Sequence, residues 1–244
     1  MKKGTANTGF EKIDFESIYL SGIAIDSVIF GLHDKRLMVL LLQYKNTSFH
    51  GLPGGFVLKE EDLDDAAQRI LKDRVGLTKI FLEQFHTFGK YSRYDKSFWE
   101  KILSGRDIVA PKGHFVLKRF ISVAYYALVD FTKVVPTPDE LADSCKWYDL
   151  KKLPKLVQDH GQIIAKALET LKENLDRKLI GFNLLPETFT MDELQTVYET
   201  ILNTKLLRTS FQRKMIKLGI FEKVDKKWTG GAHKAPYLYR FVSR

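Results

Sequence analysis

The chain has 244 residues, enough for one large or two modest domains, and 44% of them are hydrophobic, so it can bury a substantial core. No long apolar stretch or signal region appears, and the single cysteine, Cys145, cannot form an intrachain disulfide, so we expect a cytoplasmic protein without a membrane span. The net charge of +9 favours a polyanion among its partners.

Two strands joined by a tight turn are the first elements that the sequence predicts. Residues 21–32 and 36–45 are rich in β-branched and apolar side chains, and His33-Asp34-Lys35 between them suits a turn. A glycine turn, LPGGF at 52–56, then leads through an acidic loop into a helix. Apolar residues at helical spacing define that helix: Leu63, Ala66, Ala67, Ile70, Leu71 and Val75. Gly76 is a suitable end for it, because the residue past a helix often has a positive φ.

This segment resembles the Nudix box, a strand–turn–helix motif that holds Mg²⁺ on helix carboxylates so that the metal clamps a diphosphate. The residues that fall in register are Gly55, Glu61, Arg69, Leu71, Gly76 and Leu77. An ordinary glycine turn and helix would explain the glycines but not Glu61 and Arg69 together. The positions of the three glutamates in the second half of the box hold Ile70, Asp73 and Arg74, and an Arg puts a fixed positive charge where a dication would sit. We therefore expect a retained scaffold without hydrolysis: no catalytic residue, no metal and no cofactor.

Further strands are predicted within residues 80–95 and 115–130, with an insertion at 97–114 that holds about one helical turn and a last short strand at 145–150. Residues 156–179 follow helical spacing, with Asp159 as a plausible first residue. This helix could join two domains, pair with its symmetry mate, or pack against its own domain. The mixture of strands with a central helix is an α/β (α+β) arrangement and fits the Nudix α/β/α sandwich.

The last part of the chain is predicted to be a winged helix-turn-helix. Thr190 and Glu193 form a capping box before a helix over 191–202, and residues 203–205 end it. Thr209 or Ser210 caps a second helix, ended by Gly219, in which Phe211, Met215 and Leu218 face inward. Two strands, 220–224 and 235–242, enclose a glycine tip, which makes the wing.

Charge and composition indicate that this module binds DNA. Residues 205–244 hold eleven Lys or Arg against two acidic residues, which accounts for the whole net charge of the chain. They are also rich in apolar and aromatic side chains, which disordered tails lack, so a disordered basic tail is disfavoured. Phosphate contacts are expected near the start of the second helix and at the wing, and Gln212 and Arg213 are expected to read bases. The predicted DNA-binding residues are Lys205, Arg208, Thr209, Ser210, Gln212, Arg213, Lys214, Lys217, Lys227, His233 and Lys234.

The whole arrangement resembles the Nudix-related transcriptional regulators of the NrtR/AraR type. The segments that carry the resemblance are 52–57, 121–129, 180–202 and 210–219. It implies a Nudix-like effector domain over 1–156, a linker helix over 157–179 and a winged helix domain over 180–244. It also implies a homodimer that binds double-stranded operator DNA, as a repressor, and senses a small metabolite in the Nudix cleft: ADP-ribose in some members and a sugar such as L-arabinose in others.

The effector is harder to predict than the fold. Tyr44, His50, Phe56, Arg119 and Tyr125 lie on segments expected to border the cleft, although His50 could be a plain loop histidine and Tyr125 a core residue. The arginines at 69, 74, 93 and 119 could meet phosphates, but those at 69 and 74 could instead pair with acids at 60, 61 or 73. Loss of the metal-binding set favours an uncharged ligand, so we expect a sugar, and hence a role in carbohydrate metabolism.

The alternative is an active Nudix pyrophosphatase acting on a nucleoside diphosphate derivative, with a basic accessory domain. Glu60, Glu61 and Asp73 could still hold one Mg²⁺, which keeps this hypothesis open. Ile70 and Arg74 count against it.

Overall fold

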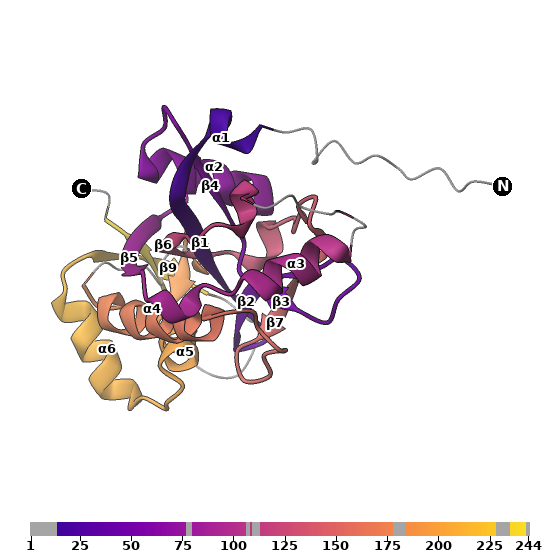
Figure 1. The fold of residues 1–244 in the computed structure, drawn as a ribbon. Coiled ribbons are helices and arrows are strands. Elements are labelled where there is room, and N and C mark those ends of the chain that lie inside the picture. Colours follow the sequence, from indigo (N-terminus) through magenta and orange to yellow (C-terminus); the bar gives the residue numbers. More distant parts are fainter. Residues whose placement is uncertain are drawn as a thin grey trace.

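The computed structural model describes residues 14–76, 80–105, 108, 113–177, 184–227 and 235–242. They form a mixed sheet with helices on both of its faces and a smaller helical and stranded unit at one end (Figure 1). Within these ranges no helix is both long and apolar enough to cross a bilayer.

The strands are named in chain order, with bounds as follows: β1 Tyr19–His33, β2 Arg36–Tyr44, β3 His50–Gly51, β4 Gly54–Leu58, β5 Leu82–Phe88, β6 Ile121–Val129, β7 Ala142–Asp149, β8 Phe189–Thr190, β9 Phe221–Lys226 and β10 Tyr237–Phe241. The α-helices are α1 Phe15–Ile18, α2 Leu63–Val75, α3 Lys96–Ser104, α4 His160–Asn174, α5 Met191–Leu202 and α6 Arg208–Lys217. The 3₁₀ helices among the described residues are η2 Tyr91–Arg93, η3 Phe115–Leu117 and η4 Phe131–Lys133.

The first predicted hairpin is confirmed. Asp34 and Lys35 join β1 to β2 and both have positive φ, 47° and 57°, as in the two-residue turns that match the twist of a hairpin. The larger sheet runs β3-β2-β1-β6-β5, with β4 also pairing β1 and β7 also pairing β2. Among the described strands of this sheet, β1 and β6 pair in parallel and the other strand pairs are antiparallel.

Side chains alternate between the two faces of this sheet, as strand geometry requires. On β1, Ile25 and Ile29 face α2, whereas Val28 and Phe30 face α4. The other central strands follow the same rule, so α2 covers one face and α4 covers the other. The predicted α/β/α sandwich is thereby confirmed.

The helix of the Nudix-like motif forms as predicted. It spans Leu63–Val75 and ends at Gly76, whose φ of 70° would strain any other side chain. The insertion differs from the prediction: α3 is nine residues long, more than one turn, because Asp95 caps it and Phe98, Ile102 and Leu103 bury one of its faces.

The C-terminal unit has the predicted helix–turn–helix and strand pair. Thr190 and Glu193 form the complete capping box, and Asn203 ends α5 in the left-handed region with φ of 52°. A three-stranded sheet, β8-β10-β9, completes the unit. The predicted glycine tip at 230–231 lies outside the described residues.

Two details of α6 were wrong. The helix begins at Arg208 with Leu207 as its N-cap, so Thr209 and Ser210 lie inside the first turn instead of capping it. Leu218, predicted to face inward, is 39% exposed, because it is the C-cap residue where the helix leaves the core. Phe211 and Met215 are buried as predicted.

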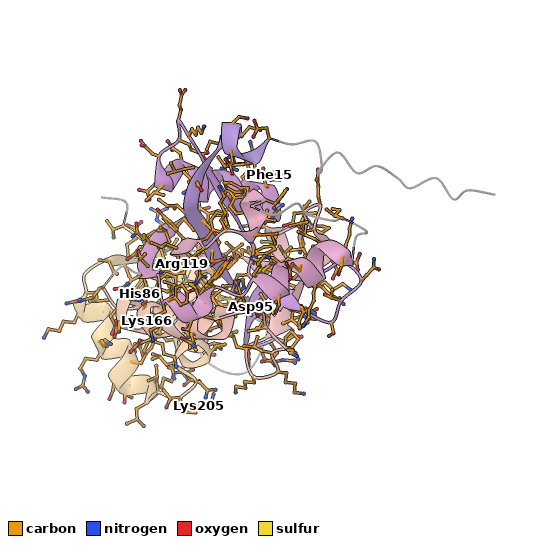
Figure 2. The ribbon with its side chains drawn as sticks, in the orientation of Figure 1. Phe15, His86, Asp95, Arg119, Lys166 and Lys205 are labelled. Atoms are coloured by element: carbon orange, nitrogen blue, oxygen red, sulfur yellow. The ribbon has the colours of Figure 1, made fainter. Side chains whose placement is uncertain are left out.

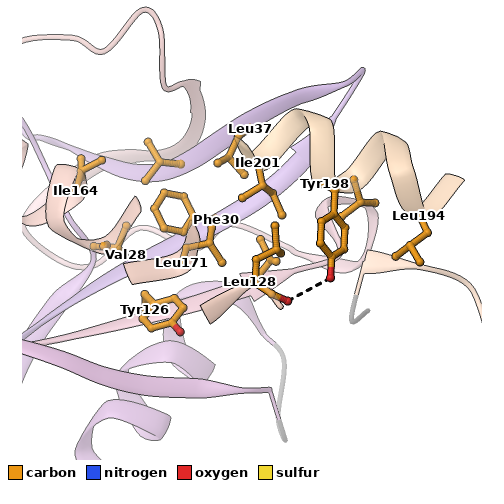
Figure 3. Packing of buried hydrophobic residues seen from close by; sticks show 14 of the residues in the cluster. Val28, Phe30, Leu37, Tyr126, Leu128, Ile164, Leu171, Leu194, Tyr198 and Ile201 are labelled. Atoms are coloured by element: carbon orange, nitrogen blue, oxygen red, sulfur yellow. Dashed lines mark hydrogen bonds between the residues drawn. The ribbon is translucent and has the colours of Figure 1, made fainter. Parts of the chain in front are cut away.

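One apolar cluster runs through both units. It joins Val28 and Phe30 of β1 to Leu171 of α4 and to Tyr198 and Ile201 of α5 (Figure 3). The predicted linker helix therefore packs against its own sheet and, at the same time, against the winged helix. Its observed bounds, His160–Asn174, are shorter than the predicted 157–179.

Candidate functional site

A cavity of about 310 Å³ opens between the sheet, α2, α3 and the start of α4. Aromatic side chains form much of its wall: Tyr19, Tyr44, Phe56, Tyr94, Trp99 and Phe120. Charged groups of both signs complete the lining: Asp26, Arg69, Asp73, Arg74, Arg93, Lys118, Asp139 and Glu140. Its size and mixture of rings and charges are those of a small-molecule site.

The glycine turn and α2 build one wall. A side chain at Gly55 would place its Cβ 2.9 Å from Ile70 Cδ1, so the turn sits directly on the helix. Arg69 clamps this arrangement, since its Nε and Nη2 donate to both oxygens of Glu61, each at 2.7 Å, and Nη2 also donates to the Phe56 carbonyl at 2.9 Å. This bond to Arg69 holds the pKa of Glu61 below its ordinary value. The two residues that match the Nudix box at the expected spacing, Glu61 and Arg69, are thus in direct contact.

Arg74 also has a carboxylate partner, but a distant one in the sequence. Its Nη2 lies 3.3 Å from Asp139 Oδ2, instead of pairing with the acids at 60, 61 or 73. Its Nε is buried and finds no hydrogen-bond partner. In the described part of the chain, no three His, Cys, Asp or Glu side chains gather closely enough to hold a metal ion. The glutamates at 60 and 61 and Asp73 are therefore not brought together as a metal site.

A buried polar network forms the floor of the cavity. Arg93 donates through Nε and Nη2 to both oxygens of Asp159, at 3.0 and 3.1 Å, and through Nη2 to Asp26 at 3.3 Å. The Arg93 side chain is only 7% exposed. His160 Nδ1 accepts the Leu52 N–H at 2.8 Å, and burial lowers the pKa of His160, so its imidazole is neutral with Nε2 toward Asp26.

The five predicted effector residues divide into two groups. Tyr44 and Phe56 line the cavity, and burial raises the pKa of the Tyr44 hydroxyl. His50, Arg119 and Tyr125 are not among the lining residues, so the structure does not place them with the other two.

Each of these three has another role. His50 contacts the Ser48 carbonyl and the Tyr148 hydroxyl, as the loop-histidine alternative anticipated. Tyr125 is buried under α2 and donates to Asp64 at 2.6 Å, as the core alternative anticipated. Arg119, labelled in Figure 2, is exposed. It donates to the Gly89 carbonyl and lies over the Tyr91 ring.

Sequence reasoning missed most of the cavity floor. Asp26 carried a usable signal, since it is a charge in the middle of the apolar run IAIDSVIF. The sequence predicts Arg93 only as a possible phosphate contact and Asp159 only as the start of a helix. Their mutual contact spans 66 positions and leaves no local pattern.

Helix α4 connects this floor to the winged helix. At its start, Asp159 makes no capping bond and is held by Arg93 instead. Just past its end, the Leu175 carbonyl accepts the Tyr198 hydroxyl of α5 at 3.3 Å, and Asp176 pairs with Lys214 of α6 at 2.5 Å. The two ends of one helix thus contact the cavity and the second helix of the winged unit.

The outer side of α6 carries cations that have no acidic partner among the described residues. Arg208, Arg213 and Lys217 are exposed there, with Gln212 half-buried beside them. Three other predicted DNA contacts do have carboxylate partners: Lys205 with Glu199 at 2.6 Å, Lys227 with Glu193 at 2.7 Å, and Lys214 with Asp176. Thr209 and Ser210 are exposed in the first turn of α6. His233 and Lys234 lie outside the described residues.

Two family descriptions match this chain: the NUDIX domain over residues 21–167 and the NrtR DNA-binding winged helix domain over residues 181–241. The ADPR responsive transcriptional repressor NtrR of Acinetobacter baylyi is 30% identical over 240 residues, which cover 96% of this chain and 86% of that protein. The ADP-ribose pyrophosphatase of Methanocaldococcus jannaschii is 30% identical over 145 residues, 58% of this chain and 70% of that protein. Among solved structures, Shewanella oneidensis NrtR complexed with a 27mer DNA matches with a TM-score of 0.67 and 27% identity, covering 90% of this chain and 93% of that one.

Proposed function

This chain belongs to the NUDIX family and carries an NrtR-type DNA-binding winged helix domain, and on that premise we propose that it is a transcriptional repressor that ADP-ribose releases from its operator. The family resemblance and the predicted fold class are confirmed. Regulation of transcription through a Nudix effector domain follows from the same matches.

One observation carries the proposal: helix α4 contacts the cavity floor at one end and the winged helix at the other. Arg93 holds Asp159 before its first turn, and Lys214 of α6 holds Asp176 just after its last. A ligand that displaces Arg93 or His160 would shift the helix start, and the packing of Leu171 against Phe30 and Tyr198 would carry the shift to α5. Coupling of this kind needs only a ligand whose affinity differs between two arrangements.

The cavity chemistry favours ADP-ribose over the sugar that the sequence suggested. Six aromatic side chains line it, and aromatic rings suit an adenine base, which stacks on them. Arg69 and Lys118, each more than a third exposed, can approach a diphosphate. A pentose alone has neither a base nor a phosphate for these groups. The Acinetobacter baylyi relative is likewise named for its response to ADPR.

We propose that the cavity binds its ligand without hydrolysing it. The residues present do not fit the Mg²⁺ site that the family implies, because Ile70 is apolar, Arg74 is cationic and Glu61 is already bound by Arg69 at both oxygens. A site lacking the metal also lacks the group that would polarise the diphosphate.

DNA recognition is assigned to α6 and the wing. Arg213 and Gln212 are proposed to read bases, while Arg208, Thr209, Ser210 and Lys217 contact phosphates. Lys205 and Lys227 would exchange their glutamate partners for phosphates, which costs little at an exposed site. One winged helix reads few base pairs, so a homodimer on a two-fold operator supplies the specificity.

The test is a gel shift on the DNA upstream of the gene, with ADP-ribose and L-arabinose titrated separately. We expect ADP-ribose to lower operator affinity by about 5- to 150-fold, the usual range of such coupling, and arabinose to leave it unchanged. Linkage also requires operator DNA to weaken ADP-ribose binding by the same factor. If arabinose releases the DNA and ADP-ribose does not, the effector assignment is wrong; if the protein binds no upstream DNA, the regulator assignment is wrong.

A second candidate function, an active pyrophosphatase, is favoured by the Methanocaldococcus jannaschii relative alone. Turnover of ADP-ribose with Mg²⁺ at about 1 s⁻¹ or more, ordinary for an enzyme, would establish it. We expect none. A converse test restores the two missing carboxylates through Ile70→Glu with Arg74→Glu, which should improve Mg²⁺ affinity if the alignment of α2 with the Nudix box is right.

A further inference from the structure

A second and larger cavity, of about 520 Å³, lies where the Nudix domain meets the winged helix. We call it the junction cavity. Its walls come from the β1–β2 turn, the segment after β7, helix α4 and the second half of α5 with the turn that follows. We call the cavity of about 310 Å³ beside α2 the Nudix cavity; among the described residues, the two cavities share no lining residue.

The lining of the junction cavity is strongly basic. Five cations contribute to it: Lys35, Arg36, Lys151, Lys172 and Lys205. Among the described residues two carboxylates also line it, Asp149 and Glu199, so this described lining carries an excess of three positive charges. Like charges gathered around a concave site raise the local potential and attract an anion.

Both carboxylates already have partners. Glu199 accepts the Leu206 N–H at 3.0 Å, Lys205 at 2.6 Å and Gln195 at 2.9 Å, and these bonds hold its pKa at about 2. Asp149 accepts the Lys151 N–H at 2.8 Å and lies 3.8 Å from Arg36.

Three ammonium groups remain without an acidic partner among the described residues: Lys35, Lys151 and Lys172. They come from three separate elements, so no single amphipathic surface explains their convergence. Lys172 is only half-exposed, so an unpaired charge there has a higher desolvation cost than on an open surface.

The rest of the lining suits an organic molecule more than a bare ion. Leu37, Leu150, Leu168 and Ile201 give it an apolar floor. The hydroxyls of Thr196 and Thr200 donate hydrogen bonds to carbonyls of their own helix, at 2.8 and 2.7 Å. Their oxygens therefore remain available as acceptors for a ligand in the cavity. Asn203 and Thr204 add an amide and another hydroxyl at the rim.

We propose that the junction cavity is a binding site for an organic phosphate of nucleotide size, separate from the Nudix cavity. Its phosphate meets the ammonium groups of Lys35, Lys151 and Lys172, and its apolar part lies over Leu37 and Ile201. Because the walls belong to both domains, such a ligand bridges them and touches the turn before α6 through Lys205.

The experiment measures AMP and inorganic pyrophosphate binding to the full-length protein by calorimetry, without DNA or ADP-ribose. The test variant is Lys35→Ala with Lys172→Ala. The matched control is Lys133→Ala with Lys166→Ala, which removes the same charge from two lysines that line neither cavity. Figure 2 shows Lys166 on α4, well above Lys205 at the lower edge of the molecule.

We expect the test variant to bind AMP at least tenfold more weakly than the wild type, which corresponds to about 1.4 kcal/mol, and the control to match the wild type. Pyrophosphate should bind more weakly than AMP but show the same pattern, because it has no apolar part. Equal AMP affinity in the two variants overturns the proposal, and so does absence of AMP binding to the wild type.

A separate arm distinguishes a free phosphate compound from the DNA backbone. If the Lys35 and Lys172 changes weaken operator DNA tenfold but leave AMP binding intact, the surface is a phosphate contact for DNA and the proposal fails. AMP that enters the Nudix cavity would bind the test and control variants alike, because Lys35 and Lys172 do not line that cavity. The difference between the variants therefore reports on the junction cavity, and its failure is distinguishable from failure of the proposed effector.

Discussion

The contact between Arg93 and Asp159 gives the sharpest test of the link from cavity to winged helix. Replacing Asp159 by Asn removes one charge but keeps an amide oxygen in place, and no helix cap is lost, because the Asp159 side chain makes no capping bond. Hydrogen bonds to charged groups contribute about 1.5–3 kcal/mol, so we expect a loss of that order in the free energy of unfolding. Full removal of Arg93 would cost more, about 3–5 kcal/mol, because Asp26 and Asp159, whose side chains are each only 13% exposed, would both lose this partner.

The matched control is Glu169→Gln on the same helix. It removes one carboxylate charge from an ion pair with Lys166, but that pair is 41% and 56% exposed, so its loss should stay within about 1 kcal/mol. Urea titration followed by circular dichroism measures both variants. For a chain of this length each kcal/mol corresponds to about 2–4 °C in Tm, which gives a second readout.

The same two proteins test the coupling itself. If Asp159 transmits occupancy of the cavity, Asp159→Asn should still bind operator DNA but lose most of the fold-change that ADP-ribose produces, whereas Glu169→Gln should respond like the wild type. Equal stability of the two variants would refute the argument from burial. A full ligand response in Asp159→Asn would refute the role of this contact in the switch.

Three further predictions follow from single contacts. Arg213→Ala should cost roughly 1–3 kcal/mol on the operator and relax preference at one position of each half-site; equal loss on random DNA in a competition gel shift would make Arg213 a backbone contact. Thr190→Ala breaks the capping box of α5 and should lower the free energy of unfolding by about 0.5–2 kcal/mol, whereas Thr132→Ala, at an exposed 3₁₀ turn, should change it far less in the same urea titration. Burial lowers the pKa of His160 from 6.5, so below that pH the unfolded chain binds a proton that the folded chain does not. The free energy of unfolding should therefore have its full value above about pH 6.5 and fall as the pH drops below it. The His160→Gln variant should show a smaller fall over the same range.

The features that the sequence predicted well are set by neighbouring residues. Asp34 and Lys35 lie between two apolar runs, so a hairpin turn there needs no knowledge of the rest of the chain. Gly76 and the Thr190–Glu193 capping box are likewise complete within a few residues. The Nudix-like register belongs to the same class, because the Glu61–Arg69 contact spans only eight positions and stays within one turn and helix.

The site itself depends on contacts that local patterns do not encode. Arg74 pairs with Asp139 although Asp73 is its neighbour in the sequence. Adjacent residues on a helix point in different directions, so Asp73 does not face Arg74. The loop at 135–141 folds over this end of α2 and brings Asp139 to it. The sequence predicts His50 and Tyr125 at the cleft from the segments that hold them. For Tyr125, strand alternation excludes the cleft, because its side chain lies on the same face of the sheet as Ile25, and α2 covers that face.

The shared core limits how the proposed switch can work. Leu194, Val197, Tyr198 and Ile201 of α5 are each 7% exposed or less and belong to the same cluster as the sheet residues beneath them. Burying one such side chain contributes about 1.5–3 kcal/mol, so pulling the winged helix off the sheet would cost several times that amount. Coupling between sites is typically only about 1–3 kcal/mol. A ligand in the Nudix cavity therefore cannot act by detaching the winged helix. It must act by a small displacement of α4 with which the winged helix moves as one body, because the shared core stays intact. In the proposed homodimer, such a displacement changes the spacing between the two α6 helices without unfolding either protomer.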